Sequence, residues 1–195
     1  MPDKSVYLMV VDGFADWEPA HALAELRRAG GYRVETVALS DAPVQSMGGV
    51  NVLPSKRISE VNAGDVAAFI LPGGDRWQEA PIEPELSSLL EKLDTNDVPI
   101  AAICAATVAI TRMGLLRGRR HTSNGLPYLR KYAPNYTDAE HYVDAPAVRD
   151  RKLITASGLA SVEFARELFE ELDVMPAGTR ALWAQVFRTG KMPAR

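Results

Sequence analysis

Three short apolar runs within the first 103 residues constrain the fold more than any other feature of the chain. They are residues 6–11, 66–71 and 98–103. Each is apolar on both faces, which is typical of the central strands of a parallel sheet covered by helices on both sides. Residues 32–37 alternate between polar and apolar instead, so we expect a strand nearer the edge of the sheet.

Helical patterns separate these runs. The expected helices cover residues 16–29, 83–96, 105–113 and 161–172. The turn-rich segment 46–49 predicts a small hairpin, and the segment 141–156 is interpreted as two further strands. Alternating strands and helices over 195 residues predict a single α/β domain, residues 1–195, with a mostly parallel sheet and helices on both faces.

Composition and charge argue against several classes of protein. The formal net charge is −3 with both signs interspersed, and no basic stripe suited to nucleic acid occurs. The first apolar run meets Asp12 too early for a signal peptide or a membrane span, so we expect a cytoplasmic protein without membrane contact. One cysteine cannot form an intramolecular disulfide, and three scattered histidines show no zinc spacing, so neither metal nor cofactor is expected.

Four segments that directly follow strands hold the candidate functional residues. In a doubly wound sheet, ligands bind beyond the carboxyl ends of the strands. The segments are residues 12–19, 71–75, 104 and 156–159. The topology therefore predicts that they converge on one rim.

Cys104, the only cysteine, stands where the third apolar run gives way to the helical run 105–110. A strand-to-helix turn with only alanines beside the thiol gives a reacting sulfur steric access. The first amides of the helix can stabilise a thiolate or an oxyanion. These features favour a nucleophile, and the alternative is a small inert cysteine of the core.

Five segments in a fixed order resemble the ThiJ/PfpI superfamily. They are Asp16-Trp17-Glu18, Leu71-Pro72-Gly73-Gly74, Ala102-Ile103-Cys104-Ala105-Ala106, the stretch 118–124 and the stretch 153–158. The resemblance spans residues 6–172 and implies a flavodoxin-like or glutamine-amidotransferase-like α/β sandwich with a cysteine nucleophile elbow. It also implies a strand after the elbow at 118–124. The superfamily includes the parkinsonism-associated protein deglycase.

The resemblance also implies roles for residues around the thiol. Cys104 would be the nucleophile, and Glu18 the carboxyl group that approaches its sulfur. The amides of Gly74 and Ala105 would form an oxyanion hole. Taken alone, Glu18 is also explained as an exposed acid in a first helical turn, and Gly73-Gly74 as a turn.

The sequence departs from two branches of the family. Ala105 stands where protease-like members have a histidine directly after the cysteine. Residues 157–159 do not supply the His-x-Glu pair of glutamine amidotransferases. The sequence therefore argues against both of these activities.

The histidine of the deglycase-like branch is also replaced. By spacing from Gly118 its counterpart is Asn124, which cannot act as a general base. His121 and His141 remain as possible bases, and His121 is the stronger candidate. The alternative for His121 is a hydrogen-bonded ring on a strand.

Other residues of the rim are expected to contact the substrate. Trp17 and Trp77 would wall the pocket, with ordinary partial burial as the alternative. The predicted substrate-binding set is completed by Gly73, Asn124, Ser157 and Gly158.

The expected reaction is attack by the Cys104 thiolate on a small-molecule electrophile. A reactive aldehyde, such as a glyoxal or its protein adduct, fits the deglycase branch, and an amide bond fits a hydrolase branch. The alternatives are a non-enzymatic oxidative-stress sensor or holdase-type chaperone in which Cys104 is oxidised, and a degenerate scaffold. An activated thiol should react with iodoacetamide below the usual cysteine pKa of about 8.5.

The segment 179–188 predicts an additional helix with an apolar face. It presents Leu182, Trp183, Val186 and Phe187, more apolar surface than a tail needs. We expect a homodimer, because family members commonly pair through helices beside the pocket. The alternative is that this helix packs on its own domain.

Overall fold

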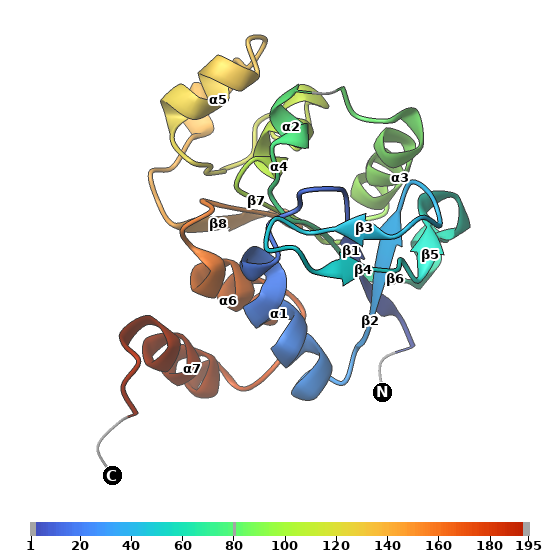
Figure 1. Cartoon of the computed structure of the whole chain (residues 1–195). Helices are drawn as coiled ribbons and strands as arrows, with labels where there is room; N and C mark the ends of the chain where they lie inside the picture. Colours follow the sequence, from blue (N-terminus) through green and yellow to red (C-terminus); the bar gives the residue numbers. More distant parts are fainter. Residues whose placement is uncertain (1–2, 80, 193–195) are drawn as a thin grey trace.

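A seven-stranded sheet forms the centre of the computed structural model, which describes residues 3–79 and 81–192 (Figure 1). The strands are β1 (Ser5–Met9), β2 (Arg33–Ala38), β5 (Lys56–Arg57), β6 (Val66–Leu71), β7 (Ile100–Ile103), β8 (Ala147–Asp150) and β9 (Leu153–Ala156). Their order across the sheet is β5-β2-β1-β6-β7-β9-β8. All neighbours are parallel except β8 and β9. The predicted mostly parallel α/β sheet is confirmed.

Helices cover both faces of this sheet (Figure 1). On one face, α1 (Trp17–Arg28) packs against α6 (Ser161–Glu171), and α7 (Ala177–Thr189) lies outside α6. The helices on the other face are α2 (Arg76–Glu79), α3 (Pro84–Thr95), α4 (Ala106–Arg112) and α5 (Leu126–Tyr132). Short 3-10 helices are η1 (Ile58–Glu60), η2 (Ala63–Asp65) and η3 (Ala139–His141).

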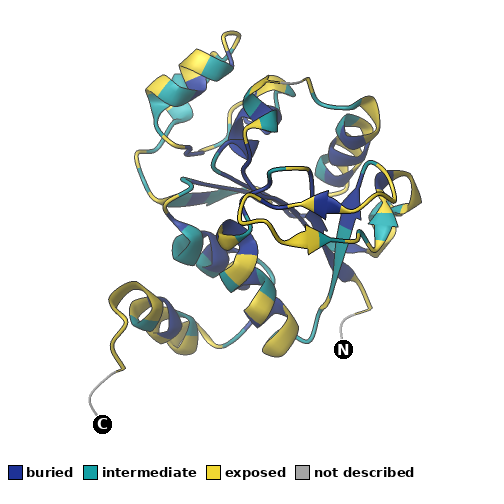
Figure 2. Ribbon diagram, in the orientation of Figure 1, coloured by how far each residue is buried: buried dark blue, intermediate teal, exposed yellow. Residues whose placement is uncertain are grey.

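The apolar runs form the buried centre of the molecule (Figure 2). All four residues of β7 are buried, which is expected for a strand that is apolar on both faces. β2 lies one strand from the edge, in agreement with its alternating pattern. In α3 the buried residues recur with helical spacing, at Leu86, Leu89, Leu90 and Leu93.

The predicted hairpin forms between β3 (Val44–Gln45) and β4 (Asn51–Val52), which pair antiparallel. Its turn is attached to the loop that precedes α1. Ser46 Oγ donates to Asp16 Oδ2 at 2.5 Å, and the Met47 N–H donates to Phe14 O at 2.8 Å. The hairpin therefore fixes the start of α1, which carries Glu18.

The stretch 118–124 is not the strand that the resemblance implies. It makes only an isolated bridge, between His121 and Tyr142. Side chains satisfy three of its backbone N–H groups: Asp138 Oδ1 accepts from Gly118 at 3.1 Å, Asp150 Oδ2 from Arg120 at 2.8 Å, and Thr155 Oγ1 from Thr122 at 2.9 Å. Because these acceptors replace strand carbonyls, no regular ladder forms.

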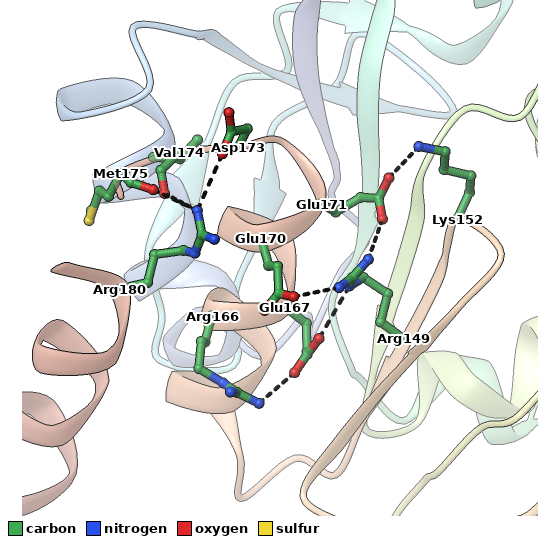
Figure 3. A network of polar contacts seen from close by, with 10 residues as sticks. All are labelled: Arg149, Lys152, Arg166, Glu167, Glu170, Glu171, Asp173, Val174, Met175 and Arg180. Carbon is green, nitrogen blue, oxygen red and sulfur yellow. Dashed lines mark hydrogen bonds and ion pairs between the residues drawn. The ribbon is translucent and has the colours of Figure 1, made fainter. Parts of the chain in front are cut away.

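A charged network fastens the edge strand β8 to α6 (Figure 3). The guanidinium of Arg149 contacts Glu167 at 3.3 Å, Glu170 at 2.9 Å and Glu171 at 3.0 Å. Lys152 Nζ lies 2.6 Å from the other oxygen of Glu171. Each of these carboxylates therefore has a cationic partner.

α7 packs partly on its own domain. Trp183 is buried, its Nε1 donates to Glu25 Oε1 at 3.3 Å, and its ring lies 4.9 Å from that of Phe169. Leu182 and Phe187 remain 43% and 48% exposed. The structure thus uses part of the predicted apolar face, and the homodimer stays a prediction.

Candidate active site

Cys104 occupies the sharp turn between β7 and α4. Its φ of 59° is a left-handed conformation that costs a non-glycine residue about 1 kcal/mol or more. Its N–H donates to Ala156 O at 2.9 Å, and its carbonyl accepts from Thr107 Oγ1 at 2.5 Å. These bonds hold the strained turn and place the sulfur at the carboxyl edge of the sheet.

Glu18 reaches the same point from the first turn of α1. It is only 1% exposed, and its Oε2 accepts from the Gly73 N–H at 2.6 Å. Burial raises the pKa of this carboxyl to about 7, against the smaller opposing effects of hydrogen bonds from Gly73 and Cys104. Glu18 is therefore not an exposed acid, and it titrates near neutral pH.

The thiol of Cys104 resists ionisation in this environment. Burial, followed by the charge of the Glu18 carboxylate, raises the thiol pKa to about 11. Hydrogen bonds from the Asn124 side chain and the Ala105 amide act in the opposite direction. The prediction of a thiol activated below its usual pKa is wrong, because burial and a like charge outweigh the donors.

Two glycines leave room for the Glu18 carboxyl group and the Cys104 sulfur to lie close together. A Cβ on Gly73 would lie 2.7 Å from Glu18 Oε2, and one on Gly158 would lie 2.7 Å from Cys104 Sγ. Either methyl group would displace the Glu18 carboxyl group or the Cys104 sulfur. Gly74 has φ 154°, and the oxyanion hole of its amide with that of Ala105 stays a prediction.

Asn124 joins the thiol to the loop after β9. Its Nδ2 donates to Cys104 Sγ at 3.2 Å, and its Oδ1 accepts from the Gly158 N–H at 2.9 Å. Asn124, which by spacing from Gly118 is the counterpart of the family histidine, therefore lies at the sulfur. Its role is that of a hydrogen-bond donor to the sulfur, which is chemistry an amide can perform.

A depression of about 280 Å³ opens over the thiol. It is lined by Trp17, Glu18, Cys104, Asn124, Ser157, Gly158 and Leu159. Leu159 is 99% exposed at this rim; it belongs to the candidate segment 156–159 but was not among the predicted substrate-binding residues. None of the seven lining residues carries a positive charge, so this surface does not favour anionic substrates.

Two predicted site residues lie elsewhere. His121 is buried, with Nδ1 2.7 Å from Arg119 O and Nε2 2.6 Å from Tyr136 Oη. Since both ring nitrogens have these partners, the prediction of His121 as the base fails on geometry. Trp77 is also buried, and its Nε1 donates to Pro72 O at 2.8 Å, so it belongs to the core rather than to the pocket wall.

The other proposed histidine is likewise engaged away from the thiol. His141 Nε2 lies 3.7 Å from Glu140 Oε1. Within residues 3–79 and 81–192, no three His, Cys, Asp or Glu side chains gather as a metal site would require. No helix in this described part is long and apolar enough to cross a bilayer.

Comparisons with known proteins extend over nearly the whole chain. The family model for the DJ-1/PfpI family matches residues 4–171. A Bacillus subtilis relative, "Uncharacterized protease YoaZ", is 36% identical over 198 residues, covering 98% of this chain and 94% of the relative. The structure of the DJ-1 superfamily protein Atu0886 from Agrobacterium tumefaciens has a TM-score of 0.87 at 32% identity, covering 96% of this chain and 98% of that chain. A more distant relative, "Deglycase PYRAB04690" from Pyrococcus abyssi, is 28% identical over 153 residues, covering 75% of this chain and 89% of the relative.

Proposed function

The chain belongs to the DJ-1/PfpI family, and on this premise we propose that it is a cysteine-dependent enzyme. Cys104 attacks the carbonyl carbon of a small reactive aldehyde or of its adduct. The contact between Cys104 and Glu18 carries this proposal, because it joins a nucleophile to a carboxyl group whose pKa is about 7. No cofactor takes part.

Glu18 acts as the base in place of a histidine. As the sulfur–carbon bond forms, the thiol proton passes to the Glu18 carboxylate and the carbonyl π electrons move to oxygen. The resulting oxyanion accepts hydrogen bonds from the amides of Ala105 and Gly74 and then takes the proton back from Glu18, which leaves a hemithioacetal. With an α-dicarbonyl, Glu18 next removes the C–H proton of the hemithioacetal carbon, and the proton returns to the neighbouring carbonyl carbon, which gives a thioester. Water then hydrolyses the thioester to a 2-hydroxy acid and regenerates the Cys104 thiol. This route needs no free thiolate in the resting state, so it is compatible with a thiol pKa of about 11.

The size of the depression favours a small aldehyde over a peptide. About 280 Å³ accommodates a small molecule, and the Pyrococcus abyssi relative is named a deglycase. Amide hydrolysis remains the second branch, because the Bacillus subtilis relative is named a protease. In that branch the same attack would expel an amine and leave a thioester.

Turnover of a substrate panel tests the proposal. We expect α-dicarbonyls to be consumed by the wild type, and kcat to fall about a hundredfold or more in Glu18→Gln and in Cys104→Ser. In the wild type, kcat/KM should rise with pH through an apparent pKa near 7, because Glu18 must be ionised to accept the proton. Turnover that survives in Cys104→Ser would contradict the proposal.

The competing function is a redox sensor or holdase. Cys104 is a free cysteine that lines the open depression, so peroxide can reach it. Its raised pKa argues against this role, because oxidation proceeds through the thiolate. Peroxide-dependent client binding without turnover would favour the sensor. A protein that shows neither turnover nor peroxide-dependent binding would be a degenerate scaffold.

We further propose that the protein forms a homodimer through the exposed face of α7. Leu182 and Phe187 retain apolar surface there after Trp183 has packed inward. Light scattering at micromolar concentration should give twice the monomer mass. A monomer would refute the dimer without affecting the chemistry of Cys104.

A further inference from the structure

Two buried hydroxyl groups connect the cysteine turn to the segment that carries Asn124. Thr107 lies in the first turn of α4, and Ser123 directly precedes Asn124. Both side chains are buried, and their oxygens lie 2.6 Å apart. This hydrogen bond therefore joins two segments that are 16 residues apart in the chain and that meet at the sulfur.

Ser123 is the donor in this pair. Thr107 Oγ1 donates to the carbonyl oxygen of Cys104 at 2.5 Å, and the Thr107 N–H donates to the same oxygen at 3.1 Å. A threonine hydroxyl has a single hydrogen, so Thr107 Oγ1 can only accept from Ser123. The hydroxyls therefore form a directed chain from Ser123 through Thr107 to the backbone of the left-handed Cys104 turn.

The segment that carries Asn124 is held by side chains, since no strand ladder holds it. The N–H of Thr122 donates to Thr155 Oγ1 at 2.9 Å, and its own Oγ1 donates to Ala145 O at 2.8 Å. These bonds attach the segment to β9 and to the loop before β8. The bond made by Ser123 attaches it to the helical turn beside the sulfur.

We propose that Ser123 is a positioning residue of the cysteine site: its bond to Thr107 holds Asn124 Nδ2 at hydrogen-bond distance from Cys104 Sγ. Asn124 and Cys104 belong to different segments, so the 3.2 Å between nitrogen and sulfur depends on how firmly these segments are joined. A hydrogen bond weakens when its distance and angle depart from the optimum. The inference rests on the proposed role of Cys104 as the reacting group.

Alkylation kinetics of Ser123→Ala test this role without knowledge of the substrate. The rate with iodoacetamide is measured on the folded full chain from pH 8 to 10, where Glu18 is ionised. A displaced Asn124 stabilises the thiolate less, so we expect the rate at pH 8 to fall about threefold and the profile to move up by about half a pH unit. Thr107→Ser, which keeps the accepting hydroxyl, should retain the wild-type profile.

Thr111→Val is the matched control for the loss of a buried hydroxyl. Thr111 Oγ1 donates to Thr107 O at 2.6 Å, a bond that lies within α4 and does not involve Ser123. Both variants should melt a few degrees below the wild type, while only Ser123→Ala should shift the alkylation profile. An equal shift in Thr111→Val would overturn the proposal, because any buried hydroxyl of this region would then affect the thiol.

A double-mutant cycle identifies the route of the effect. If Ser123 acts through Asn124, then Ser123→Ala should cause no further shift in an Asn124→Ala background. An unchanged profile in Ser123→Ala, or full additivity with Asn124→Ala, would overturn the proposal.

A second variant covers the case in which Ser123→Ala does not fold. Thr107→Val removes the other hydroxyl of the pair and should shift the profile at least as far, because the bond to the Cys104 carbonyl is lost as well. A wild-type profile in Thr107→Val, or failure of both variants to fold, would show the pair to be structural and overturn the inference. Loss of turnover in every substrate assay, with the alkylation effects intact, would count against the proposed reaction alone.

Discussion

Glu18 and Glu171 are two buried carboxyl groups that the molecule treats in opposite ways. Glu18 is 1% exposed, and the Glu171 side chain is 5% exposed. Glu171 meets two cations, Arg149 at 3.0 Å and Lys152 at 2.6 Å (Figure 3). Glu18 meets neutral donors, the Gly73 amide and the Cys104 thiol.

The difference shows that burial alone does not decide the role of a carboxyl group. Cations around Glu171 compensate its charge and attach β8 to α6, which is a structural use. At Glu18 the charge is left without a cation, so burial raises the pKa to about 7 and the group becomes a proton acceptor at neutral pH. Four variants test this contrast.

The largest effect is expected from a newly introduced buried carboxylate that has neither a cation nor hydrogen-bond donors as partners. Ile100 is 1% exposed in β7, between Phe69 and Leu153 on the neighbouring strands. Ile100→Asp should abolish cooperative folding, because a buried charge without donors or a cation costs more than the stability of a small domain. Circular dichroism during thermal unfolding measures this. Ile100→Val, which should cost about 1 kcal/mol, is the control, and a cooperatively folded aspartate variant would contradict the assignment.

The second effect is the pH dependence that Glu18 imposes on stability. Its pKa is raised from 4.5 to about 7 on folding, so the folded state binds the proton more tightly than the unfolded state. The free energy of unfolding should therefore fall by about 3 kcal/mol as pH rises from 4.5 to 7. Glu18→Gln cannot ionise and should lose this slope, which makes it more stable than the wild type at pH 8. Urea unfolding at a series of pH values measures both proteins, and parallel curves would refute the shifted pKa.

The third effect comes from removing Arg149, the kind of cationic partner that Glu171 has and Glu18 lacks. Arg149→Met should destabilise the protein by about 2 kcal/mol, because Glu167 and Glu171 stay buried with fewer cations. Arg33→Met is the matched control, since Arg33 is 78% exposed and its pair with Glu35 should contribute little. Urea denaturation at low salt compares the two variants. Equal midpoints would show the network to be dispensable.

The smallest change in stability is expected at Gly158. Gly158→Ala places a methyl group 2.7 Å from Cys104 Sγ and should cost about 1 kcal/mol while slowing alkylation of the thiol. Gly178→Ala is the control, because its Cβ meets nothing within 4 Å in the helix α7. That variant should be as stable as the wild type or more so. If both alanines leave thiol labelling unchanged, the contact with Gly158 does not shape the site.

Sequence reasoning recovered the elements whose signals are local. The apolar runs predicted β1, β6 and β7, and the strand-to-helix break placed Cys104 at the turn between β7 and α4. The resemblance placed Glu18 and Asn124 near the sulfur, which is where the structure has them.

The failures depend on partners that lie far away in the sequence. His121 resembles a base until its ring is seen to contact Tyr136, and Trp77 resembles a pocket wall until its indole is seen to contact Pro72. The stretch 118–124 lacks a ladder because acceptors about thirty residues later take its N–H groups. The thiol pKa depends on the balance between burial and donors, and that balance is visible only when the packing is known.

Both edge strands of the central sheet are poorly suited to pairing with a strand of another molecule. β5 is two residues long and consists of Lys56 and Arg57, and β8 carries Arg149 and Asp150. Short, charged borders discourage edge-to-edge growth, which is the usual route from a folded sheet to fibrils. Copies of this protein that associate must then contact one another through helix and loop surfaces. Such contacts can form a closed, finite assembly in which no strand lies at the interface.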